Sequence, residues 1–219
     1  MQAGETVKQG TIMRQPRIFG LAGLLGASVF AGSLILLHLT HTDINWTRHY
    51  VSDFTNGRLG WVFVLGVVVH GFGNLGLSLG LRQSLDPGSL RAWAFLLFGL
   101  AAAGIMVAAL FPIDPVGRYP TLVGLVHRVA TIATFPLELV ALFLFSAAFA
   151  RHPRWRRRSV TSFVLSTVAA VGLAGFLLAF VLNRMAGLAE RLALASFLAW
   201  ELWVSLQLAR SASGVEVAR

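Results

Sequence analysis

Six apolar stretches, each long enough to cross a lipid bilayer, occupy most of this 219-residue chain. A helix needs about 20 apolar residues to cross the hydrocarbon core of a membrane, because it rises about 1.5 Å per residue. A water-soluble domain of this size has no interior that could bury six such segments. We therefore predict an all-α membrane protein built as a bundle of six transmembrane helices. The predicted helices are Ile18–Leu39, Leu59–Leu81, Ala92–Phe111, Leu122–Ala150, Val160–Leu182 and Leu188–Leu208.

The composition agrees with a membrane location and argues against a nucleic-acid partner. Hydrophobic residues make up 56% of the chain and charged residues only 12%, well below the charged share of an ordinary globular domain. The net charge of +9 comes from basic residues in short loops and tails, so we expect no nucleic acid to bind. The chain has no cysteine, which excludes disulfide bonds and thiolate metal ligands.

The basic residues also predict the orientation in the membrane. Lys and Arg are enriched in the cytoplasmic loops of membrane proteins. We predict that residues 1–17 form a cytoplasmic tail, that the six-helix domain covers residues 18–209, and that residues 210–219 form a second cytoplasmic tail. Twelve basic residues then face the cytoplasm, and only Arg48, Arg58, Arg118 and Arg184 face the other side. The cytoplasmic twelve are Lys8, Arg14, Arg17, Arg82, Arg91, Arg151, Arg154, Arg156, Arg157, Arg158, Arg210 and Arg219.

Polar residues inside three of the predicted helices recur on one face of each helix. An ionisable side chain in the hydrocarbon region is costly unless it is paired, hydrated or turned toward the bundle interior. Residues three or four positions apart lie on the same side of a helix. We therefore predict a shared polar interior. Its stripes are His127, Thr131, Thr134 and Glu138; His70, Asn74 and Ser78; and Glu190, Glu201 and Ser205.

The third helix lacks such a stripe, and we expect it to face lipid or to pack closely through Gly99 and Gly104. The loops on the non-cytoplasmic side hold further polar groups, and Arg128 is expected to pair with Glu190. The sequence thus predicts a pocket that opens outward. Its candidate ligand-binding residues are Ser52, Asp53, His70, Asn74, Asp114, His127, Arg128, Glu138, Glu190 and Glu201.

Several short segments resemble a known bacterial family. They are Tyr50-Val51-Ser52-Asp53-Phe54, then Gly60-Trp61, then Phe111-Pro112-Ile113-Asp114, then His127, and finally the segment from Gly187 to Glu190-Arg191. With these segments the chain resembles the six-helix membrane proteins catalogued as domain of unknown function 998. The resemblance implies a six-helix fold in the bacterial inner (cytoplasmic) membrane, crossed several times. It implies no activity.

The candidate residues leave several functions open. The first is a site for a lipid or small ligand in the pocket, with membrane lipids as partners. A metal-dependent lipid hydrolase is an alternative, with zinc bound by His70, His127, Asp53 and Asp114. This set is loosely similar to that of the ceramidase and adiponectin-receptor hydrolases, but the chain lacks their histidine pair in the last helix and has one helix fewer. Haem bound between His70 and His127 is a further alternative.

Two further hypotheses involve no catalysis. Glu138 and Glu201 could titrate along a path for transport of a proton or small solute. No inverted repeat is visible, however, and a structural role for both residues is the simpler interpretation. The chain could also be an accessory subunit bound to another membrane protein, since Gly20, Gly23 and Gly26 permit close helix packing.

Overall fold

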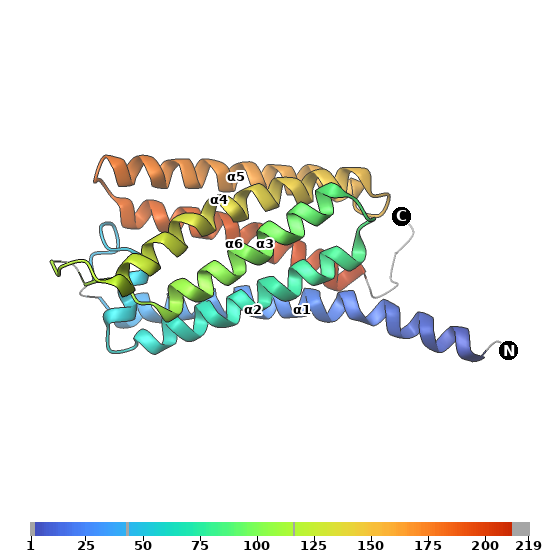
Figure 1. Cartoon of the computed structure of the whole chain (residues 1–219), viewed down its shortest axis with the longest axis horizontal. Coiled ribbons are helices and arrows are strands. Elements are labelled where there is room, and N and C mark those ends of the chain that lie inside the picture. Colours follow the sequence, from blue (N-terminus) through green and yellow to red (C-terminus); the bar gives the residue numbers. More distant parts are fainter. Residues whose placement is uncertain (1–2, 43, 116, 212–219) are drawn as a thin grey trace.

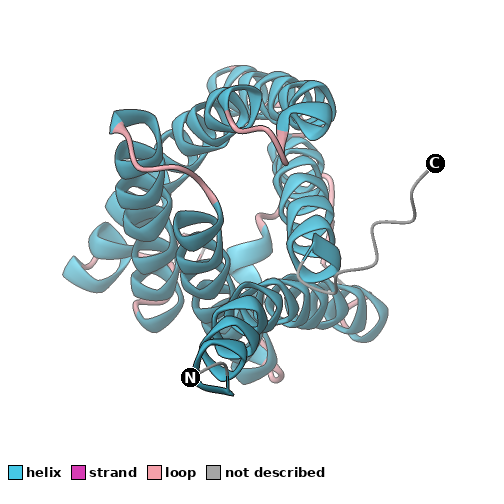
Figure 2. Cartoon of the chain, turned by 90° about the vertical axis from the view of Figure 1, so that its right-hand side faces the viewer, coloured by secondary structure: helices cyan, strands magenta, loops and turns pink. Residues whose placement is uncertain are grey.

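The computed structural model describes residues 3–42, 44–115 and 117–211 of the chain. Within these residues the secondary structure consists only of helices, joined by loops (Figures 1 and 2). Six helices are long and apolar enough to cross a membrane, which confirms the six predicted segments. The elements are α1 (Ala3–Thr40), the short 3₁₀ helix η1 (Val51–Asn56), α2 (Gly60–Ser84), α3 (Ser89–Leu110), α4 (Leu122–Arg151), α5 (Arg156–Val181) and α6 (Ala186–Ser211).

The first helix begins earlier than the sequence predicts. It starts at Ala3, so most of the expected tail of residues 1–17 continues α1 and projects beyond the other helices (Figure 1). The apolar part of α1 that could cross a membrane starts at Pro16, close to the predicted Ile18. Of the tail predicted at 210–219, residues 212–219 lie outside the described residues.

The six helices form a closed ring in chain order. Each helix packs mainly against its neighbours in sequence, and α6 returns to pack against α1 (Figure 2). Connections of four residues explain the α2–α3, α4–α5 and α5–α6 pairs, because a short connection leaves consecutive antiparallel helices side by side. The ring encloses an interior to which the polar stripes contribute.

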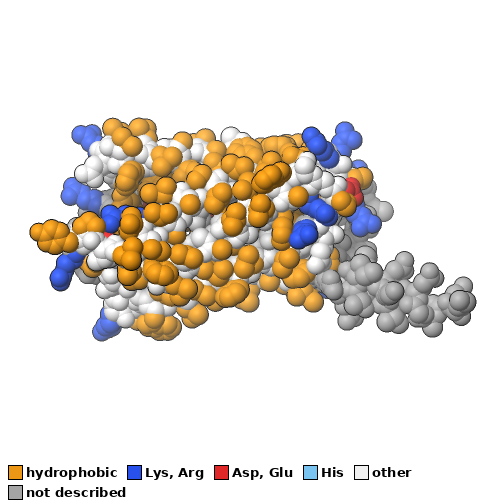
Figure 3. All heavy atoms as spheres, in the orientation of Figure 1, with side chains coloured by type: hydrophobic (Ala, Val, Ile, Leu, Met, Phe, Trp, Pro, Cys, Tyr) orange, Lys and Arg blue, Asp and Glu red, His pale blue; other side chains and the backbone are white. Residues whose placement is uncertain are grey.

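The ring has two ends, which we name by their contents. The η1 end contains η1, the loop between α3 and α4, and the loop between α5 and α6. The terminal end contains the remaining loops and the end of α6 (Figure 1). Basic side chains gather at both ends, with an apolar belt between them (Figure 3).

Glycines bring α1 close to two other helices. A side chain added at Gly26 would meet the backbone of Gly73 on α2, and one added at Gly20 would meet the backbone of Ala209 on α6. The sequence suggested these glycines for packing against another membrane protein, whereas Gly20 and Gly26 pack against helices of the same chain. On α3, Gly104 lies against Thr134, whereas Gly99 has no neighbour within 4 Å, so the expectation for Gly99 was wrong.

The helix most exposed to lipid is α5 rather than α3. Of the six spans, α5 has the smallest buried share, and within the ring it packs against α4 and α6. A polar cluster holds it there. The Ser162 hydroxyl lies 2.6 Å from that of Ser146 on α4 and accepts a hydrogen bond of 2.9 Å from the Trp200 indole on α6. These serines were missed because a helix bonds most serine hydroxyls to its own backbone.

Large aromatic side chains fill the ring toward the terminal end. We call this group the aromatic plug: Phe98, Phe145, Phe149, Trp155 and Trp200. All five are almost fully buried, and their rings stack or meet edge to face, with centroids 4.5 Å apart for Phe149 and Trp155 and 5.9 Å apart for Phe98 and Phe145. Such pairs add stability beyond the area they bury. The plug leaves the open part of the interior to the η1 half.

Candidate functional site

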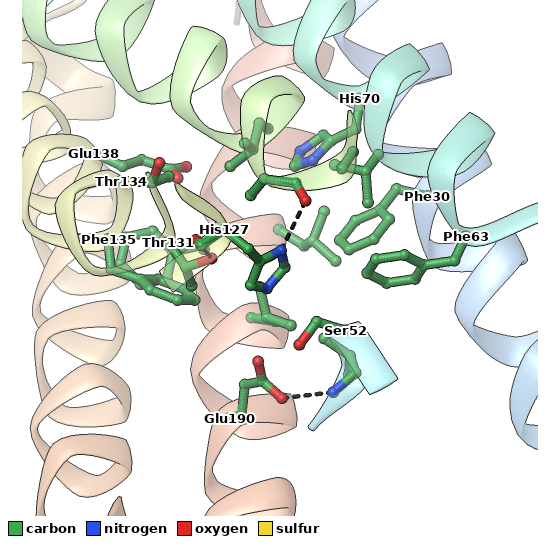
Figure 4. A pocket seen from close by; sticks show the side chains of 18 of the residues that line it. Phe30, Ser52, Phe63, His70, His127, Thr131, Thr134, Phe135, Glu138 and Glu190 are labelled. Carbon is green, nitrogen blue, oxygen red and sulfur yellow. Dashed lines mark hydrogen bonds between the residues drawn. The ribbon is translucent and has the colours of Figure 1, made fainter. Parts of the chain in front are cut away.

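A cavity of about 90 Å³ lies inside the ring in the η1 half (Figure 4). Residues of α1, η1, α2, α3, α4 and α6 line it, and α5 contributes none. Its polar lining residues are Ser52, His70, His127, Thr131, Thr134, Glu138, Glu190 and Glu201. Its apolar wall consists of Phe30, Val51, Phe63, Val67, Ile105, Ala108, Ala109, Phe135, Leu194, Phe197 and Leu198. Six of the ten predicted pocket residues are therefore brought together, and Asp53, Asn74, Asp114 and Arg128 lie outside the lining.

The short helix η1 covers the cavity and is fixed by a carboxylate from α6. The backbone N–H of Val51, the first residue of η1, donates a hydrogen bond of 2.7 Å to Glu190. An acceptor at this position satisfies an N–H group that the helix leaves unpaired. The bond places the next residue, Ser52, in the cavity wall. Asp53 instead stabilises the turn from outside the cavity, because it accepts from the backbone N–H of Tyr50 at 2.9 Å.

Arg191 attaches the loop before η1 to α6. Its guanidinium donates to the His49 carbonyl at 2.7 Å and to the His38 ring at 2.7 Å. Gly187, one helical turn earlier, lies against the His49 backbone so closely that a side chain would collide with it. The segments around Tyr50–Phe54 and Gly187–Arg191, which carry the family resemblance, are thus in contact. No role was predicted for Arg191, although an arginine within an apolar helix already indicates a specific partner.

His127 links α4 to the end of α3. Its Nδ1 donates to the carbonyl oxygens of Ala108 at 2.8 Å and Phe111 at 2.9 Å, which satisfies carbonyls that the last turn of a helix leaves free. Because carbonyl oxygens only accept, Nδ1 carries a hydrogen, and only in the neutral form of the ring is Nε2 an acceptor. Figure 4 shows this ring on the same side of the cavity as Ser52 and Glu190. In its neutral form His127 therefore offers a hydrogen-bond acceptor with a fixed tautomer.

Four buried polar side chains form a group at the floor of the cavity, which we call the acid cluster: His70, Asn74, Glu138 and Glu201. His70, Glu138 and Glu201 line the cavity, and Asn74 lies outside the lining and bonds Glu201. The His70 Nε2 atom lies 2.6 Å from one Glu201 oxygen, and the Asn74 amide donates to the other oxygen at 2.5 Å. The His70 ring also stacks on Phe30, with centroids 4.9 Å apart. The carboxyl groups of Glu138 and Glu201 lie close enough to interact electrostatically.

Three oxygens at or beside this floor lack a hydrogen-bond partner among the described residues. They are Oε1 of Glu138, the hydroxyl of Thr134 one turn earlier on α4, and Oδ1 of Asn74. Of the three residues, Glu138 and Thr134 are buried and line the cavity. Buried polar groups are nearly always hydrogen-bonded, so the oxygens of Glu138 and Thr134 mark a place where a further partner fits.

Asp114 and Arg128 form an ion pair at the rim of the η1 end. Asp114 accepts from the Thr121 hydroxyl at 2.6 Å and from Arg128 at 3.2 Å. The hydrogen bonds from Thr121, helped by Arg128, hold the pKa of Asp114 below its ordinary value. The predicted pairing of Arg128 with Glu190 was wrong, since Glu190 points inward to Val51 while Arg128 lies at the surface.

The residues predicted to bind zinc are not assembled. Asp53 and Asp114 are used in separate turns, His127 bonds the end of α3, and His70 bonds Glu201. Among residues 3–42, 44–115 and 117–211, no three His, Asp or Glu side chains are grouped as metal ligands. The haem interpretation meets the same difficulty, because Nε2 of His70 is already bonded to Glu201.

Comparison with known proteins identifies a family of uncharacterised activity. The family model described as "Protein of unknown function (DUF998)" matches residues 24–207. This range includes every residue that lines the cavity. No curated protein and no solved structure matches the chain.

Proposed function

Because the chain belongs to the DUF998 family, whose description states no activity, we propose a function from its cavity. The protein is a bacterial inner-membrane protein that binds a small polar ligand, or the polar head of a lipid, inside the helix ring. Both termini face the cytoplasm and the η1 end faces outward, since the distribution of basic residues favours this orientation. The cavity then receives its ligand from the outer side.

The observation that carries this proposal is the lining of the cavity. Ligand sites combine mostly apolar walls with a few converging polar groups. Here eight polar side chains from η1, α2, α4 and α6 converge on an otherwise apolar space. A structural polar network would close on itself, whereas this one leaves Glu138 and Thr134 with unpaired oxygens.

The size of the cavity limits the ligand. An apolar cavity of about 150 Å³ binds benzene, so about 90 Å³ accepts a group of roughly four non-hydrogen atoms. A lipid would therefore place only part of its head here and keep its tails outside.

The position of the cavity favours binding over passage. The aromatic plug fills the terminal half of the ring, and η1 covers the other end through a small number of hydrogen bonds. Metal-dependent hydrolysis receives no such support, because its four residues lie in different parts of the η1 half.

A pair of alanines on α3 allows a matched test. Ala109 lines the cavity, whereas Ala103 is exposed on the same helix. Ala109→Leu adds three carbon atoms to a space for about four, and Ala103→Leu adds the same atoms on the lipid side. Each protein is extracted into polymer nanodiscs without detergent, and co-purifying lipids and small molecules are quantified by mass spectrometry.

We expect wild type and Ala103→Leu to retain the same molecule in the same amount and Ala109→Leu to lose most of it. Equal retention by all three proteins would contradict ligand binding in this cavity. The thermal midpoints of both variants, measured in parallel, control for loss of folding.

A further inference from the structure

We infer that the cavity selects a ligand carrying a small ammonium group, which binds at Glu138 and Thr134. The inference rests on the proposed function and specifies the chemistry of its ligand. Four features of the cavity support it: its unpaired oxygens, its charge, its aromatic wall and its size.

The unpaired oxygens define the position of the ligand. Glu138 is 6% exposed and Thr134 is 3% exposed, so neither reaches solvent outside the protein. Figure 4 shows the two side chains next to each other at the cavity. An ammonium group has three N–H donors, which suffice for Oε1 of Glu138, the Thr134 hydroxyl and one further acceptor.

The charges around the cavity select a cation over an anion. Three of the lining residues are glutamates, and none is lysine or arginine. The two arginines nearest to it in the sequence are directed elsewhere, Arg128 to Asp114 and Arg191 to the loop before η1. A phosphate or carboxylate in this cavity would meet acidic groups without a balancing cation, which is costly at low dielectric.

Aromatic side chains and the small volume favour an organic amine. Phe30, Phe135 and Phe197 belong to the wall, and aromatic rings attract cations through their negative faces. A volume of about 90 Å³ suits an amine with one to three carbons. The source can be a free alkylamine or the head of phosphatidylethanolamine, which share the same primary ammonium group.

The ammonium group forms an ion pair with Glu138. When R–NH₃⁺ binds, the carboxylate of Glu138 accepts a charge-assisted hydrogen bond from it. The titratable groups facing Glu138 are Glu201 from α6 and His70 from α2, with His127 and Glu190 farther along the cavity. The residues that α1 and α3 contribute to the lining are all apolar.

The test uses ethylammonium and ethanol, which have the same number of non-hydrogen atoms and differ in charge. The full chain is placed in phosphatidylcholine nanodiscs, and binding is followed by calorimetry. Glu138→Gln retains shape but removes the charge, and Thr134→Val removes one acceptor with little change in shape. Asp86→Asn, at an exposed acidic residue of the terminal end, is the matched control.

We expect wild type and Asp86→Asn to bind ethylammonium at least about tenfold more tightly than ethanol, as charge-assisted hydrogen bonds predict. Glu138→Gln should lose this preference, and Thr134→Val should weaken it. Competition by nanodiscs containing phosphatidylethanolamine identifies the lipid head as the source, and its absence identifies a soluble amine.

Two results would overturn the ammonium assignment. One is equal affinity of wild type for ethylammonium and ethanol, as for a cavity that holds only water. The other is unchanged ethylammonium binding by both Glu138→Gln and Thr134→Val. Either result leaves the comparison of Ala109→Leu with Ala103→Leu unaffected, so the failure of this inference is distinguishable from failure of the proposed function.

Discussion

Replacing Gly26 by alanine tests whether close packing of α1 on α2 positions the floor of the cavity. A Cβ atom at Gly26 would lie 2.9 Å from the Gly73 Cα and 3.0 Å from the Val69 carbonyl oxygen. Carbon atoms prefer about 3.5–4.0 Å, so the two helices must separate by roughly 1 Å. Overpacking of this kind costs about 1–3 kcal/mol. The added Cβ would also lie 3.3 Å from the His70 Cα, so the change reaches the acid cluster.

Gly32→Ala is the matched control on the same helix, because nothing lies within 4 Å of a Cβ there. Both variants gain the helix propensity of alanine over glycine, about 0.5–1 kcal/mol. This gain cancels in their difference. Gly26→Ala should therefore be less stable than Gly32→Ala by about 1–3 kcal/mol.

The measurement is equilibrium unfolding by SDS in mixed micelles, followed through tryptophan fluorescence. Equal midpoints for the two variants would show that α1 and α2 do not meet at Gly26. A higher midpoint for Gly26→Ala would refute the packing argument outright.

Two further predictions concern the η1 end. The pKa of Asp114 is lowered in the folded protein. Its contribution to stability is therefore complete above the ordinary Asp pKa of about 3.9 and is lost as the pH falls through the lower folded value. The thermal midpoint of Asp114→Asn should fall less between pH 6 and acid than that of wild type, and an equal fall of the two midpoints would refute this prediction. His127→Ala removes a cavity acceptor and the bonds to Ala108 and Phe111, whereas His41 contacts Leu37 and Phe54. His127→Ala should thus reduce ligand retention more than His41→Ala, and equal effects would contradict the assignment of His127 to the cavity.

The interior of the ring was predictable because polar side chains of apolar helices are costly in contact with lipid and therefore turn toward the bundle interior. Helical spacing put His127, Thr134 and Glu138 on one face, and the cost of exposing them to lipid turned that face inward. The structure has all three buried at the cavity. The six helices followed from segment length alone.

The partners of these residues were not predictable from spacing. Helical periodicity gives the direction of a side chain but not the depth of the helix opposite, so Arg128 was paired with Glu190 when Asp114 in a neighbouring loop was nearer. The zinc set failed for a related reason, since Asp53 and Asp114 lie in loops whose local turns use their oxygens. Close approach of two backbones, as at Gly187 and His49, also leaves little trace in a single sequence.

The acid cluster lies where the cavity meets the aromatic plug, and this position limits how the protein can work. Glu201 bonds His70 and Asn74 on the cavity side, while Trp200, its neighbour in sequence, belongs to the plug and bonds Ser162 on α5. A ligand bound at Glu138 would therefore lie near Glu201, the residue next to Trp200. Passage to the terminal end would require Phe98, Phe145 and Trp200 to separate, with loss of their packing and of the Trp200–Ser162 bond. Binding at the cluster needs no such separation, and this difference favours the proposed binding site over a segment of a channel.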